Sequence, residues 1–270
     1  MVHGATGVRL TVAGELAGGQ VGAVRVRWPD GHVSVLTWLP GVAAVDFRER
    51  QEAAWRAARA AGVPAPELEA LAEGDGVLVL VQQLLPGAPP EAVDVALLEQ
   101  VLGVVDRCAG LLDEAVPPVR LWLTDSGPGF CLHEPLREHG ARAAAVERWV
   151  RAVGRRLPDD VLPGSDVVHL DVQPANLLVQ DGRLAGVVDW DGAGRGDRRS
   201  DLVTLRFGLH AVPVADDVVR RLDAVLDAVP AAVLEAAWAH MSLRMVDWAI
   251  RHSPPEQVGH WLSLAERRAG

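Results

Sequence analysis

The stretch VVHLDVQPANLLVQDGRLAGVVDWDGAGRGDRRSDL, residues 167–202, decides the fold of this chain. It contains two strand-like runs, 177–180 and 183–188, which are separated by Asp181-Gly182. Asp-Gly between two such runs is a strong signal for a β-hairpin, because both central residues of the tight turn adopt a left-handed backbone. We therefore predict that this stretch folds back on itself and brings its two ends together.

Three oxygen-bearing side chains are predicted to meet at the open end of this hairpin. Counting back from the turn places Asn176 opposite Val187, and Asp189 lies two residues further along on the same face. Such diagonal neighbours have Cα atoms about 7–8 Å apart. Asp171 lies on the loop that enters the hairpin. Carboxylate and amide oxygens suit Mg²⁺ bound together with phosphate oxygens, so the sequence predicts a metal–phosphate site here.

These residues resemble a known family. The segment H-L-D-V-Q-P-A-N, residues 169–176, followed by V-D-W, residues 188–190, resembles the catalytic and metal-binding segments of aminoglycoside phosphotransferases and choline kinases. Those families are similar in turn to protein kinases. The resemblance implies that Asp171 orients the acceptor hydroxyl and accepts its proton. It also implies that Asn176 and Asp189 hold Mg²⁺ against the phosphates of ATP or GTP.

His169 and Asp201 are expected to support the segment 169–176, which we call the catalytic loop, without taking part in the reaction. His169 is expected to brace the loop through hydrogen bonds. Asp197 and Asp201 match the G-D-x-x-x-D-L pattern that follows in the family, and we interpret Asp201 as a helix cap or as an acceptor for the loop amides.

The remainder of the chain predicts an α+β, protein-kinase-like fold with two lobes. Residues 8–38 alternate as strands do, residues 46–61 have a helical pattern, and a continuous apolar run ends near Gln83. The segment LPGAPP, residues 85–90, is a linker, and the chain after it is mostly helical. We expect a β-rich N-terminal lobe over residues 1–84 and a C-terminal lobe over 85–270, with helices at 91–115, 141–157, 216–229, 231–252 and 256–268.

The predicted N-terminal lobe departs from the kinase pattern at one position. Kinase-like folds place a lysine on the third strand, paired with a helix glutamate, to bind the nucleotide phosphates. Thr37 stands where that lysine is expected, and all 26 residues counted as Lys+Arg are arginines. Glu52 is the candidate for the helix glutamate, and Glu49 is the second candidate.

Three explanations of this departure remain open. In the first, Arg25 supplies the missing cation: a three-residue loop at 29–31 places it opposite Val35, on the face of Thr37, whereas a two-residue turn places it on the other face. In the second, Mg²⁺ and backbone amides suffice and turnover is slower. In the third, the protein binds nucleotide without transferring phosphate.

Two further segments are candidates for nucleotide contacts. Gly19 and Gly22 belong to a glycine-rich loop between the first two predicted strands, where backbone N–H groups can cover phosphates. The kinase-like fold further implies that the backbone near Gln83 binds the adenine.

Composition narrows the class of partner. The 36 Asp+Glu against 26 Lys+Arg give a formal net charge of −10, which argues against nucleic acid or an anionic membrane. Cys108 and Cys131 are too few for a disulfide framework, and we interpret both as buried fillers in a cytoplasmic protein. The expected acceptor is a hydroxylated small molecule, such as an aminoglycoside-like antibiotic or an amino alcohol. The alternatives are a non-catalytic nucleotide-binding partner protein and a kinase of peptide Ser or Thr.

Overall fold

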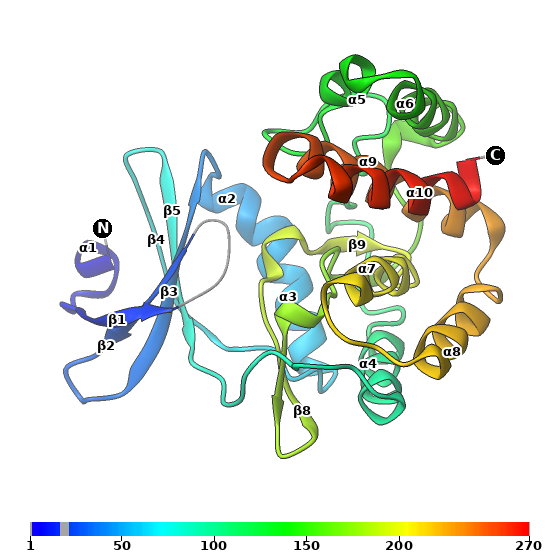
Figure 1. Cartoon of the computed structure of the whole chain (residues 1–270). Coiled ribbons are helices and arrows are strands. Elements are labelled where there is room, and N and C mark those ends of the chain that lie inside the picture. The colour runs from blue at the N-terminus through cyan, green and yellow to red at the C-terminus, as the bar shows by residue number, and fades with distance from the viewer. Residues whose placement is uncertain (1, 17–21, 270) are drawn as a thin grey trace.

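The computed structural model describes residues 2–16 and 22–269. A β-sheet with one long helical segment forms the N-terminal part, and helices form most of the remainder (Figure 1). The mixed α+β architecture predicted from the sequence is confirmed. The N-terminal elements are α1 (Val2–Thr6), β1 (Thr11–Leu16), β2 (Ala23–Arg27), β3 (Val33–Pro40), α2 (Ala44–Phe47), the π-helical turn η1 (Arg48–Glu52), α3 (Ala53–Ala60), β4 (Leu68–Gly74) and β5 (Val77–Gln83).

The five strands form one antiparallel sheet in the order β1-β2-β3-β5-β4. β5 lies between β3 and β4, and its apolar run is buried, as predicted. Leu78 and Leu80 belong to the same hydrophobic core as Phe47 and Trp55, so this face of the sheet packs toward the helical segment α2–α3. β4 was not predicted, because its mixed sequence LEALAEG lacks a clear alternation of apolar and polar residues.

The β2–β3 turn settles the register that the sequence left open. The Trp28 N–H donates to the His32 carbonyl at 3.0 Å, so residues 29–31 form a three-residue loop. Arg25 consequently pairs with Val35. Since alternate residues of a strand share a face, Arg25 lies on the same face of the sheet as Thr37.

The second part of the chain contains most of the predicted helices, with different ends. The predicted helix at 91–115 ends at Arg107, followed by Gly110 with φ 64°. Two shorter helices, α5 and α7, were not predicted. The elements are α4 (Val95–Arg107), α5 (His133–His139), α6 (Ala141–Gly154), β6 (Asp166–Val168), β7 (Leu177–Gln180), β8 (Arg183–Val187), β9 (Gly194–Gly196), α7 (Ser200–Gly208), α8 (Asp216–Leu226), α9 (Ala231–His252) and α10 (Pro255–Ala269), with short 3₁₀ turns at Pro158–Asp160, Pro174–Asn176, Trp190–Gly192 and Leu209–Ala211.

The predicted hairpin is β7–β8, but its register differs from the prediction. Gln180 pairs with Arg183, as expected, and a bulge in β8 then adds one residue. Leu177 therefore lies opposite Val187, and the Val188 N–H donates to the Asn176 carbonyl at 2.9 Å. The expectation that Asn176 faces Val187 was wrong by one residue, since a bulge leaves no signal in the alternation of side chains.

The expectation for the two cysteines can be compared with the structure. Cys108 and Cys131 are buried and free, and burial raises the pKa of each thiol to about 12. Among the helices formed by residues 2–16 and 22–269, none has the length and the apolar character that a membrane span requires.

Candidate active site

Asp171 lies in the loop between β6 and β7 and is held from three sides. Its Oδ2 accepts hydrogen bonds from Asn176 Nδ2 at 2.9 Å and from Gln173 Nε2 at 3.1 Å. Its Oδ1 lies 3.0 Å from Nη2 of Arg244 in α9, and the Asp171 side chain is 15% exposed. A carboxylate oriented by several donors and still open to solvent has the geometry that a general base requires.

Asn176 is oriented by the same contacts. Its Nδ2 donates both to the Asp171 carbonyl and to the Asp171 carboxylate, at 2.9 Å in each case. These bonds fix the amide plane, so the side-chain oxygen points away from Asp171. Within the part of the chain that the structure describes, no donor is bonded to that oxygen. Asn176 therefore presents a free amide oxygen, which is a ligand that hard divalent cations accept.

Asp189 and Asp191 place excess negative charge beside Asp171. Asp189 is exposed and adopts a left-handed backbone, with φ 69°. Although part of Asp189 is exposed, desolvation by the protein around it, together with the Asp171 carboxylate, raises the pKa of Asp189 to about 6. Desolvation and the carboxylates of Asp189 and Asp171 raise the pKa of Asp191 to about 7. Crowded carboxylates without a basic partner of their own fit a divalent cation, which would relieve this repulsion.

His169 braces the catalytic loop, as predicted. Its Nε2 donates to the Val188 carbonyl at 3.1 Å, which leaves Nδ1 unprotonated and facing the Asp171 N–H at 3.3 Å. The ring packs edge-on against Trp190, with centroids 4.5 Å apart. Burial lowers the pKa of His169 to about 4, so the ring is neutral at pH 7. His169 thereby ties the catalytic loop to the segment that carries Asp189.

Asp201, in the first turn of α7, accepts hydrogen bonds from two amides of the catalytic loop. Its Oδ2 accepts from the His169 N–H at 2.9 Å, and its Oδ1 accepts from the Leu170 N–H at 2.8 Å. The side chain is buried, and Leu170 has φ 66°, an unusual backbone for leucine. The predicted role of Asp201 as an acceptor for loop amides is confirmed.

We expect Asp201→Asn to lower the free energy of unfolding by about 1–3 kcal/mol, because one loop amide then faces an NH₂ group instead of an acceptor. Burial raises the pKa of Asp201 to about 7. A folded-state pKa above the unfolded one means that wild type loses stability as the pH rises toward 7, whereas the variant does not. Urea unfolding at pH 5 and pH 8 checks this: the difference between the proteins should be smaller at pH 8, and a larger difference there would contradict the expectation.

The predicted nucleotide-binding residues lie on or near the sheet. Thr37 pairs with Leu80, and its hydroxyl accepts a hydrogen bond from Gln82 Nε2 at 3.4 Å. The Gln83 N–H already donates to the Glu67 carbonyl at 2.8 Å. Any adenine contact from Gln83 therefore uses its carbonyl. Gly22 has φ 83°, which favours glycine, and Gly19 lies outside the described residues.

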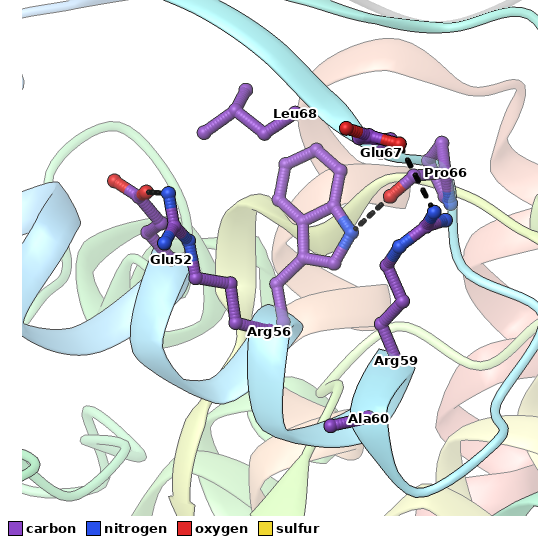
Figure 2. A pocket seen from close by; sticks show the side chains of 8 residues that line it. Glu52, Arg56, Arg59, Ala60, Pro66, Glu67 and Leu68 are labelled. Carbon is purple, nitrogen blue, oxygen red and sulfur yellow. Dashed lines mark hydrogen bonds and ion pairs between the residues drawn. The ribbon is translucent and has the colours of Figure 1, made fainter.

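Glu52 lies at a pocket of about 470 Å³ between α3 and the start of β4. Its carboxylate is 2.6 Å from Arg56 and 3.8 Å from Arg48, both on the same helical segment. Figure 2 shows the pair with Arg56 at one end of the pocket and Arg59 with Glu67 at the other. Across residues 2–16 and 22–269, neither Glu52 nor Glu49 forms an ion pair with Arg25.

Arg244 is the site residue that sequence reasoning missed. It comes from α9, far along the chain, and its guanidinium contacts both Asp171 and the Leu170 carbonyl. No motif surrounds it: the flanking sequence MSLRMVDW reads as an ordinary buried helix. One signal was available, since a charged residue in an otherwise apolar helical stretch requires a partner.

Comparisons with known proteins agree with this geometry. Residues 15–244 match the phosphotransferase enzyme family (APH). Among solved structures, one similar protein is a thermostable mutant of aminoglycoside phosphotransferase APH(4)-Ia, in a ternary complex with AMP-PNP and hygromycin B. Its sequence is 16% identical, the TM-score is 0.66, and the alignment covers 99% of this chain and 96% of that one. The apoenzyme of macrolide 2′-phosphotransferase MphH from Brachybacterium faecium is 20% identical with a TM-score of 0.50, covering 97% and 94%.

Among the curated proteins, none matches this sequence significantly. The family match spans most of the chain, from the first strand of the sheet to Arg244 in α9. It includes the catalytic loop and the V-D-W segment on which the predicted resemblance rested. The fold agrees with it, because the solved neighbours are covered almost from end to end. The chain therefore belongs to the phosphotransferase enzyme family.

Proposed function

We propose that this phosphotransferase moves the γ-phosphate of ATP or GTP to a hydroxyl group of a small molecule. The observation that carries the proposal is the surroundings of Asp171, which accepts a hydrogen bond from Asn176 and whose charge raises the pKa of Asp189. A solved structural neighbour with AMP-PNP and hygromycin B supports a nucleotide donor and a small acceptor. Because ATP is a cytoplasmic substrate, we place the activity in the cytoplasm.

In the proposed reaction, Asp171 is the general base. As the acceptor oxygen bonds to the γ-phosphorus, its proton passes to a carboxylate oxygen of Asp171, and the bond between the γ-phosphorus and the β–γ bridging oxygen breaks. The nucleoside diphosphate leaves with that oxygen. Gln173 and Asn176 keep the Asp171 carboxylate in one orientation, and Asp201 and His169 hold the loop that carries it.

Asn176 and Asp189 are the proposed holders of Mg²⁺. The free amide oxygen of Asn176 and the crowded carboxylate of Asp189 match the oxygen ligands of that ion. When bound, Mg²⁺ neutralises charge on the nucleotide phosphates during transfer. The backbone of Asn176 also accepts the Val188 N–H, which keeps the two ligand-bearing segments together.

Arg25 is the proposed substitute for the missing lysine. It lies on the Thr37 face of the sheet and is exposed toward solvent. We expect Arg25→Ala to weaken the binding of Mg·AMP-PNP by about 10- to 150-fold, because a charge-assisted contact to phosphate contributes about 1.5–3 kcal/mol. Isothermal titration calorimetry measures this affinity.

Arg27→Ala is the matched control for Arg25→Ala. Arg27 lies two residues away on the same face of β2, and its guanidinium donates to the Gly31 carbonyl at 2.9 Å. This variant should bind Mg·AMP-PNP as wild type does. Equal affinity of Arg25→Ala and Arg27→Ala would remove Arg25 from the nucleotide site and favour binding through Mg²⁺ and backbone amides.

The proposed function is tested by ADP release from Mg·ATP in the presence of hydroxylated small molecules. We expect release that depends on one class of acceptor and on Mg²⁺. Nucleotide binding without any acceptor-dependent release would favour a non-catalytic nucleotide-binding protein, the reading that Thr37 supports. Absence of both binding and release would overturn the proposal.

A further inference from the structure

The guanidinium of Arg244 contacts Asp171, the residue that receives the acceptor hydroxyl in the proposed function. Its Nη2 lies 3.0 Å from Asp171 Oδ1, and its Nη1 donates to the Leu170 carbonyl at 3.1 Å. An arginine carries five N–H donors, so contacts to the described residues leave most of them free. The side chain is 29% exposed, which leaves these donors accessible from solvent.

The exposed face of α9 continues from Arg244 as an aromatic and basic stripe. Trp248 follows one helical turn later on the same face, since residues four apart are neighbours. His252 lies a further turn along, and its ring packs against Trp248 at a tilt of 37°, with ring centroids 4.0 Å apart. The Arg251 guanidinium lies 5.8 Å from the Trp248 ring. We call Arg244, Trp248, Arg251 and His252 the α9 stripe.

No free carboxylate accompanies the α9 stripe on its own helix. Asp247 is the one acidic residue between residues 241 and 252. It is fully buried, lies 2.6 Å from Arg251 and accepts the Leu132 N–H at 3.0 Å. The charge of Asp171 is likewise balanced by Arg244. Asp189 and Asp191 also lie near enough to Asp171 for its charge to raise the pKa of each, and in the proposed function Mg²⁺ neutralises their charge.

This distribution of charge indicates whether the site favours a cationic or an anionic acceptor. An ammonium group next to the reacting hydroxyl would be repelled by the guanidinium of Arg244. Because α9 carries no unpaired carboxylate, nothing on that helix would offset the repulsion. A carboxylate or phosphate in the same place would receive a charge-assisted pair of hydrogen bonds from Arg244. A ring of the acceptor can pack on Trp248, because an aromatic face accepts a flat or sugar ring.

We propose that the acceptor is a hydroxylated ring compound with an anionic group, and that Arg244 binds that group while Trp248 packs against the ring. The proposal rests on the proposed function, in which Asp171 receives the acceptor hydroxyl. It differs from the aminoglycoside-like or amino-alcohol acceptor that the sequence suggested. The difference arises from α9, whose side chains reach the site only in the folded protein.

Three 4-nitrophenyl β-glycosides that differ only at C6 test the proposal: the glucuronide with a carboxylate, the glucoside with a hydroxyl, and the 6-amino-6-deoxyglucoside with an ammonium. Calorimetry measures their binding to the full chain with and without Mg·AMP-PNP. We expect the glucuronide to bind at least about tenfold more tightly than the amine, with the glucoside between them. Equal or tighter binding of the amine, or no binding by any of the three, would overturn the proposal.

Variants on α9 and one control variant outside it show which residue causes the preference. Arg244→Met should remove the preference for the carboxylate, Arg244→Lys should restore most of it, and Trp248→Ala should weaken all three ligands alike. Arg221→Met is the control, because Arg221 of α8 forms an exposed ion pair with Glu99 of α4 and lies outside the α9 stripe. It should keep the preference. A preference that survives in Arg244→Met, with its folding verified by thermal unfolding, would overturn the role of Arg244.

The outcomes separate this inference from the proposed function. Acceptor-dependent ADP release with amines preferred would contradict the inference and leave phosphoryl transfer in place. A tenfold preference for the glucuronide with no ADP release from any acceptor would contradict transfer and leave the binding role of Arg244 in place.

Discussion

Replacing Asp171 with Asn is expected to reduce acceptor-dependent ADP release by about 100- to 10,000-fold, the range that general base catalysis contributes. The amide has nearly the same shape, but it cannot accept the hydroxyl proton. Nucleotide affinity should stay within about twofold, because Asp171 contacts the acceptor side of the site. Steady-state kinetics and calorimetry with Mg·AMP-PNP measure the two quantities on the same preparation.

Asp181→Asn is the control for Asp171→Asn. Asp181 occupies the turn of the β7–β8 hairpin with φ 51°, which asparagine tolerates as well as aspartate, and it is exposed. The variant Asp181→Asn makes the same chemical change a short distance from the site and should leave turnover unchanged. ADP release by Asp171→Asn at the wild-type rate would remove Asp171 from the mechanism.

The second large effect is expected from Asp189→Asn, which should lower ADP release by at least about 100-fold, since a metal ion contributes several kcal/mol to such a transition state. Binding of AMP-PNP should lose most of its dependence on Mg²⁺. Calorimetric titrations of AMP-PNP at several Mg²⁺ concentrations measure this dependence, again with Asp181→Asn as control. An unchanged dependence on Mg²⁺ would exclude Asp189 as a metal ligand.

The same variant should be more stable than wild type when metal is removed. The pKa of Asp189 is raised to about 6 by desolvation and by Asp171, so the folded protein favours the neutral carboxyl. Wild type therefore loses stability as the pH rises through 6, and an asparagine has no charge to lose or gain. In EDTA at pH 8, Asp189→Asn should melt at a higher temperature than wild type, and the gap should close toward pH 4. Equal melting temperatures at pH 8 would contradict this account.

Loss of a functional carboxylate should lower activity and raise stability, whereas loss of a structural carboxylate should lower stability. Asp201 is the contrast within the same site: its carboxylate is satisfied by two loop amides, and its loss should lower stability. Asp189 has no such donors among the described residues, and its retention is costly without a cation. Proteins commonly keep strained or crowded charges where function requires them.

Much of the candidate site could be predicted because it is local in sequence. The Asp181-Gly182 turn specifies its own hairpin, and the spacing of Asp171, Asn176 and Asp189 around it requires no knowledge of the remaining chain. The Pro29-Asp30-Gly31 loop likewise determined the register of Arg25. Short-range geometry of this kind follows from backbone dihedral preferences.

Other predictions were wrong or missing for identifiable physical reasons. The predicted partner of Asn176 was wrong by one residue because of the bulge in β8. A bulge is defined by how a strand pairs with its neighbour, so the sequence of the strand alone does not show it. The short helix α7 was missed because it is buried along nearly its whole length and therefore lacks an amphipathic pattern. The helix α5 has only 7 residues, which is too short for such a pattern to stand out.

By itself, the sequence determined the α+β class, the phosphotransferase motif and the hairpin that carries it, because each depends on residues close together in the chain. Only the tertiary structure decided that Arg244 of α9 pairs with Asp171, and that the aromatic and basic stripe of α9 therefore begins beside Asp171. Those contacts join segments far apart in sequence, and their geometry exists only once the core has packed the helices against the catalytic loop.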